Sequence, residues 1–201
     1  MLIQESLEKL RQEVKEMASD ALTIFDKSVA MIQSRDASHL PEVREMDKGI
    51  NDKEMRLDKQ CMELLLKEPY ALDFRFVFSS IKTIKDLERV GDHSKTIAKW
   101  SLKLRTETED MKNLKEKARE ALFTAMDALI HSDPDLAARV MELEFQVDEL
   151  EDRIIDTTEE IAEAFVAKSL ERIGDLATNI AENVIFCVNA QDVRHGGYHK
   201  S

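Results

Sequence analysis

Hydrophobic residues recur along most of this chain at alternating spacings of three and four, the period of one face of an α-helix. In the N-terminal segment this stripe includes Leu7, Leu10 and Val14, and it continues through Ala21 to Met31. The spacing therefore predicts one long amphipathic helix at the start of the chain.

Breaks in the pattern divide the rest of the chain into five further helices. Pro41 suits the first turn of a helix, and Glu68-Pro69 ends one, because the residue before a proline disfavours the helical conformation. Asp133-Pro134 pairs an N-cap residue with a proline at the first helical position. The later helices are predicted at about 39–67, 71–104, 106–131, from 135 onward and at 165–190, followed by a flexible tail over 191–201.

The chain also contains an internal repeat. The segment LERVGDHSKTIAKW, which begins at Leu87, aligns with LERIGDLATNIAEN, which begins at Leu170, at an offset of 83 residues. Further upstream Asp36 matches Asp133 at an offset of 97, so the second copy is 14 residues shorter between its last two helices. We expect an all-α fold of two tandem three-helix bundles over 1–104 and 105–190, related by a pseudo-twofold repeat.

The second copy lacks an obvious turn between its last two helices. The segment EEIAEAFVAKS contains neither glycine nor proline, so 135–190 could be one uninterrupted helix that could not fold back on itself. We therefore expect a loop near Glu163 to Phe165, with residues missing from this sequence at that point.

Composition supports the helical prediction and narrows the function. Five glycines and three prolines among 201 residues leave little material for β-turns, and a net charge of −12 disfavours nucleic acid and anionic membranes. No apolar run is long enough to cross a bilayer, and the charged N-terminus is unlike a signal peptide, so we expect a cytoplasmic protein. No nucleophile–base set or glycine-rich phosphate loop indicates an enzyme.

Each repeat places two carboxylates at positions i and i+4 of one helix face: Glu88 with Asp92, and Glu171 with Asp175. Like charges at this spacing cost a helix roughly 0.2 to 0.5 kcal/mol, and each pair borders an apolar stripe. The preceding helices carry matching polar stripes, with Asp47, Asn51, Glu54 and Asp58 in the first unit and Glu144, Asp148 and Glu151 in the second.

Two interpretations of these stripes remain open. Facing carboxylates would suit hard cations such as Mg²⁺, Mn²⁺, Ca²⁺ or iron, and no histidine follows at the spacing of ferritin-like di-iron sites. Alternatively, they are solvated faces of a purely structural helical adaptor or dimerisation module. Gly91 and Gly174, inside the same helices, fit either a tightly packed neighbouring helix or an ion cluster that needs space.

The repeated L-E-R-[IV]-G-D string in two three-helix units resembles the PhoU family of phosphate-uptake regulators. The resemblance implies a cytoplasmic negative regulator that links a phosphate ABC transporter ATPase to a sensor histidine kinase. It also implies multinuclear iron or zinc, with Mn or Mg as alternatives, at the E/D-x-x-x-D motifs. We further expect a homodimer, formed through apolar surface such as the Phe74 to Phe78 cluster.

The two motifs match that family pattern unequally. The second keeps its polar positions at Glu171, Asp175, Asn179 and Glu182, supported by Glu144 and Asp148. The first has Thr96 and Lys99 where the second has Asn179 and Glu182, and Asn51 where the second has Asp148. We expect metal at Glu88, Asp92 and Asp47 to bind weakly or not at all, and the second site to be the occupied one.

Overall fold

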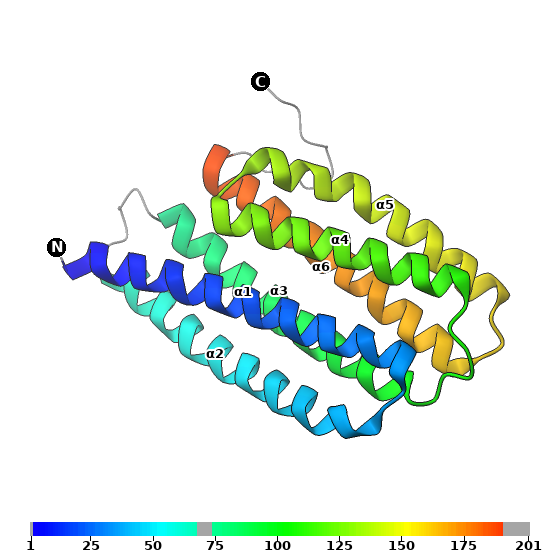
Figure 1. Cartoon of the computed structure of the whole chain (residues 1–201). Helices are drawn as coiled ribbons and strands as arrows, with labels where there is room; N and C mark the ends of the chain where they lie inside the picture. The colour runs from blue at the N-terminus through cyan, green and yellow to red at the C-terminus, as the bar shows by residue number, and fades with distance from the viewer. Residues whose placement is uncertain (1, 68–73, 191–201) are drawn as a thin grey trace.

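The amphipathic stripes form six α-helices in the computed structural model, which describes residues 2–67 and 74–190 and confirms the all-α prediction (Figure 1). In chain order the elements are α1 (Leu2–Ser34), the 3-10 turn η1 (Ala37–His39), α2 (Leu40–Lys67), α3 (Phe74–Ser101), α4 (Glu109–His131), α5 (Pro134–Thr157) and α6 (Ile161–Asn189). The predicted hairpin at Glu68-Pro69 and the C-terminal tail lie outside the described residues.

The repeat is visible in how the second helix of each unit begins. The Asp36 side chain accepts a hydrogen bond from Ser38 N (2.9 Å), and that of Asp133 accepts from Asp135 N (2.9 Å) and Leu136 N (3.1 Å). These aspartates satisfy backbone donors that have no partner within a helix. Two residues that the alignment pairs across the units therefore perform the same local task.

Helices α3 and α6 form the centre of the molecule, because each packs within its own unit and against the other (Figure 1). They run in opposite directions in that view, with α2 and α5 on the outer sides. The core is continuous from one unit to the other and includes Leu10, Met17 and Ile24, which have no exposed surface. The carboxylate pairs of both repeats therefore lie on the two most central helices.

The turn between α5 and α6 lies at residues 158–160, and not near Glu163 to Phe165, where the break was expected. Hydroxyl groups form this turn in place of glycine or proline. The Thr158 hydroxyl accepts from Glu160 N (3.1 Å) and donates to Glu163 (2.7 Å), whose other carboxylate oxygen accepts from the Thr108 hydroxyl (2.7 Å). The second unit folds back because short side chains supply the turn's hydrogen bonds.

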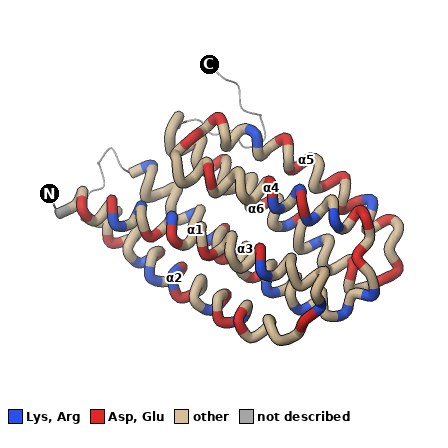
Figure 2. The backbone as a smooth tube through the Cα atoms, in the orientation of Figure 1, with Lys and Arg blue, Asp and Glu red and all other residues tan. Residues whose placement is uncertain are grey.

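Charged residues are dispersed over the helices. Figure 2 shows Lys and Arg interspersed with Asp and Glu along the bundle, without the single basic stripe that would favour nucleic acid. Within the described ranges, none of the helices combines the length and apolar character needed to span a membrane.

Candidate metal centre

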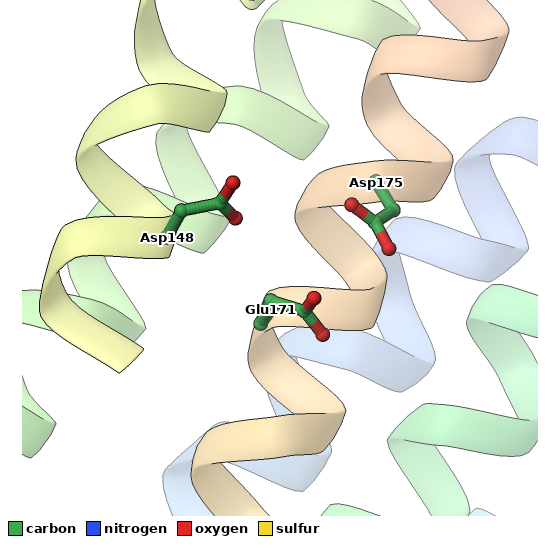
Figure 3. Close-up of side chains that lie close together, drawn as sticks. All are labelled: Asp148, Glu171 and Asp175. Carbon is green, nitrogen blue, oxygen red and sulfur yellow. The ribbon is translucent and has the colours of Figure 1, made fainter. Parts of the chain in front are cut away.

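Three carboxylates of the second unit converge between α5 and α6. Glu171 and Asp175 lie one turn apart on α6, and Asp148 faces them from α5 (Figure 3). Each offers one oxygen atom, and these atoms lie within 4.8 Å of one another. The i, i+4 spacing and the pairing of two polar stripes produce this arrangement, as the sequence predicted for these positions.

Burial leaves part of this cluster without hydrogen bonds. The Glu171 side chain is only 12% exposed, and Asp175 is 33% exposed. Asp148 Oδ1 and Glu171 Oε2 are inaccessible to solvent and have no hydrogen-bond donor, although Arg172 Nε lies 3.5 Å from Glu171 Oε2. Buried polar atoms normally have a partner, so these oxygens have unused capacity for a cation.

The positively charged side chains around the cluster do not balance its negative charge. Burial and the neighbouring Asp175 raise the pKa of both Asp148 and Glu171, and burial together with Asp148 raises the pKa of Glu144. Lys168 pairs with Glu171 and Glu151, at 3.4 and 3.3 Å, and Arg172 pairs with Asp175 at 2.8 Å. These raised values mean that ionising the carboxylates costs free energy that a bound cation would recover.

The donor atoms of the cluster are all carboxylate oxygens. Oxygen ligands suit iron, Mn²⁺ and Mg²⁺, whereas zinc sites more often include histidine or cysteine. The residues therefore fit iron better than zinc among the metals that the family resemblance implied.

The other candidate ligands of the second unit lie at different places relative to the cluster. Glu144 is close enough for the charges of Asp148, Asp175, Glu182 and Glu171 to act on it. Asn179 instead lines a groove between α3 and α6. Asp148, Glu171 and Asp175 thus form the centre, with Glu144 beside it.

The first unit brings its candidates together around a lysine. Lys95 Nζ donates to Asp47 Oδ2 at 2.6 Å and to Asp92 Oδ1 at 2.8 Å, and Asp47 is buried. Burial and the charges of Asp92, Glu54 and Asp47 raise the pKa of the neighbouring Glu88. A side-chain ammonium therefore already lies between two carboxylates of the first unit.

Sequence reasoning missed this lysine, although the repeat contained a signal for it. Position 95 aligns with Thr178, so only the first unit places a cation three residues after its aspartate. The weaker first site was expected from Thr96, Lys99 and Asn51, whereas the cation that contacts its carboxylates is Lys95.

The two glycines are explained by packing between helices. A Cβ at Gly174 would lie 3.0 Å from Val147 Cγ1, and one at Gly91 would lie 3.4 Å from Ile50 Cδ1. Val147 and Ile50 are equivalent positions of the repeat and are almost fully buried. The glycines allow the helices that carry the carboxylates to approach each other closely.

Comparison with known proteins identifies the family of this chain. The PhoU domain model matches residues 14–101 and 111–184, one match in each unit. The phosphate-specific transport system accessory protein PhoU homolog of Pseudomonas putida is 31% identical over 210 residues, covering 95% of this chain and 82% of the relative. The accessory protein PhoU of Escherichia coli is 29% identical over 209 residues, covering 95% and 87%.

Solved structures show the same fold. The crystal structure of PhoU from Pseudomonas aeruginosa aligns with a TM-score of 0.85 and 27% identity, covering 94% of this chain and 99% of the other. That of the phosphate transport system regulatory protein PhoU from Streptococcus pneumoniae aligns with a TM-score of 0.84 and 23% identity, covering 95% and 99%. With both units matched by the family model and the whole helical architecture shared, this chain belongs to the PhoU family.

Proposed function

We propose that this protein is a cytoplasmic, metal-dependent accessory regulator of phosphate uptake and is not an enzyme. The observation that carries the proposal is the cluster of Asp148, Glu171 and Asp175, whose oxygen atoms lie within 4.8 Å and include two buried atoms without hydrogen bonds. The names of its relatives, which are phosphate-specific transport system accessory proteins, supply the biological setting.

In this proposal the protein acts negatively on a phosphate ABC transporter ATPase and on a phosphate-sensing histidine kinase. Iron is the metal that best fits an all-carboxylate donor set, with Mn²⁺ or Mg²⁺ as substitutes. Metal at the centre would change the charge of the α5–α6 face and therefore the partner surfaces that this face attracts. A homodimer is part of the proposal, supported by the exposed aromatic side chains of Phe74 and Phe78, which are 46% and 38% exposed.

Elemental analysis of untagged protein purified without chelator tests the metal assignment. We expect a stoichiometric amount of iron or manganese in the native protein and only traces in the Glu171→Gln/Asp175→Asn double variant, which keeps the side-chain shapes but removes two charges. The control variant Glu149→Gln/Asp156→Asn removes two exposed charges from α5 and should retain the metal. Traces in all three proteins would instead favour the metal-free helical adaptor.

A further inference from the structure

A groove of about 680 Å³ lies between α3 and α6, next to the metal centre. Three of the side chains that line it are cations, Arg89, Lys95 and Arg172, and two are carboxylates, Asp92 and Asp175. Arg89 and Arg172 are equivalent positions of the repeat, so one guanidinium comes from each unit. Unlike the acidic centre beside it, this groove has an excess of positive charge.

The three cations differ in how fully they are neutralised. Lys95 is bound by Asp47 and Asp92, as described above. Arg89 makes no hydrogen bond or ion pair with any residue that the structure describes, although Asp86 and Glu88 are close enough for its charge to act on them. Arg89 therefore offers an open guanidinium to a ligand in the groove.

The third cation, Arg172, is shared between the groove and the metal centre. Its Nη1 lies 2.8 Å from Asp175 Oδ2, and its Nε lies 3.5 Å from Glu171 Oε2. Both partners belong to the carboxylate cluster. A metal ion at the cluster would neutralise these two carboxylates and weaken their hold on Arg172. Arg172 would then be able to contribute its donors to the groove together with Arg89.

We propose that the groove between α3 and α6 binds a tetrahedral oxyanion, either free phosphate or the phosphoryl group of a monoester, through Arg89 and Arg172. Metal at the carboxylate cluster strengthens this binding because it releases Arg172. Guanidinium groups match phosphate oxygens with paired hydrogen bonds, and the Asn179 amide in the groove wall can add a further donor. The effect of metal on anion binding rests on the proposed metal site, whereas anion binding in the groove does not depend on it.

Calorimetric titration with inorganic phosphate tests both parts, using metal-free protein and protein loaded with Mn²⁺ and freed of excess ion. We expect Mn²⁺ to tighten phosphate binding about fivefold or more, and phosphate to tighten Mn²⁺ binding by the same factor, because coupling between two sites is reciprocal. Arg89→Gln should lose most phosphate affinity in both forms. Arg44→Gln, which removes an exposed guanidinium on α2 outside the groove, should change nothing.

Arg172→Gln provides the sharpest test, since this residue contacts both sites. It should weaken phosphate binding and strengthen Mn²⁺ binding, because the removed cation competes with the metal for Glu171 and Asp175. A parallel titration with phosphoserine distinguishes the two sources of the anion: tighter binding than phosphate indicates a phosphorylated partner, and weaker binding indicates the free ion.

Other outcomes would overturn the inference. If Mn²⁺ binds but phosphate binds to neither form, the groove is not an anion site and the metal proposal stands. If phosphate binds only with Mn²⁺ and the Arg89→Gln variant binds it normally, the anion contacts the metal and not the groove. If phosphate binds and Mn²⁺ does not, the proposed metal function fails and the coupling with it.

Discussion

Two residues of the first unit differ from their repeat equivalents in ways that change the chemistry around them. Lys95 stands where the second unit has Thr178, and its ammonium lies between Asp47 and Asp92. Asp86 stands where the second unit has Ser169, and it is a buried carboxylate with Asn183 at 3.5 Å. Single substitutions can therefore test why the two units are chemically unequal.

Replacing Lys95 by threonine, the residue of the second unit, should open a cation site in the first. Asp47 and Asp92 would lose their shared ammonium, next to Glu88, whose pKa burial and neighbouring charges already raise. We expect the Lys95→Thr variant to bind more Mn²⁺ per chain than the native protein, measured by calorimetric stoichiometry. The control variant Lys99→Thr removes one positive charge a turn further along α3 and should leave the Mn²⁺ stoichiometry unchanged. Equal Mn²⁺ stoichiometry in the two variants would contradict the role assigned to Lys95.

Asp86 should make the stability of the protein depend on pH. Burial raises its pKa from 3.8 to about 6, against the opposing effect of Arg89 and Lys82. Because the folded value is the higher one, the stabilising effect of protonation is complete below pH 3.8 and is lost as the pH rises through 6. At pH 7.5 we expect Asp86→Asn to melt on the order of 5 °C higher than the native protein.

The difference in melting temperature should shrink as the pH falls from 7.5 toward 5, since the native Asp86 then becomes neutral as well. Scanning calorimetry on metal-free protein at several pH values measures it. A difference that stays constant across this range would show that the carboxylate does not titrate there.

At the scale of helices, α3 and α6 each pack closely against the helix that precedes them in the chain, α2 and α5 respectively. Gly174 meets Val147, and Gly91 meets Ile50. The sequence left open whether these glycines make space for a helix or for an ion. Only the packed structure decides between these two explanations, because the local sequence does not give the distance from each glycine to a residue far along the chain.

Gly174→Ala should destabilise the protein, whereas Gly91→Ala should be tolerated. The added Cβ at 174 would lie 3.0 Å from a β-branched valine with little rotational freedom, at a cost of roughly 1 to 3 kcal/mol. At 91 the nearest atom is 3.4 Å away, and the gain of about 1 kcal/mol in helix propensity offsets that contact. Urea unfolding of both variants measures the difference, and equal midpoints would contradict it.

The turn between α5 and α6 shows the limit of sequence signals at this scale. Asp133-Pro134 correctly predicted the start of α5, because an N-cap residue and a proline favour a helix start through contacts with adjacent residues. The end of α5 carried no such local signal. Thr158 and Glu163 make the turn together with Thr108, which is about 50 residues earlier in the chain, so the contact that holds it is tertiary.

At the scale of the whole molecule, the units are joined by the α3–α6 contact and by α1 against α4, where Arg119 makes two hydrogen bonds to Asp26. The candidate metal centre lies between α5 and α6, and α6 is one of the two central helices. Metal bound there should consequently stabilise the complete bundle, since an ion that binds only the folded state shifts the unfolding equilibrium.

We expect Mn²⁺ at about 100 times its dissociation constant to add roughly 2.7 kcal/mol, which raises the melting temperature by about 5 to 10 °C. Chelator should reverse the rise, as measured by scanning calorimetry. The Asp148→Asn/Asp175→Asn variant should show no rise at all. Should the native protein melt at the same temperature with and without metal, the helical adaptor would be the better description of this chain.

The sequence by itself determined the helical class, the internal repeat and the polar stripes that carry Glu171, Asp175 and Asp148. All of these follow from periodicity, capping and repetition, which act over a few residues or can be read by alignment. The tertiary structure alone decided which carboxylates meet: Asp148, Glu171 and Asp175 converge between α5 and α6, whereas Asp47 and Asp92 of the first unit meet at Lys95. The reason is physical, because a binding site depends on distances between side chains on different helices, and those are set only when the helices pack.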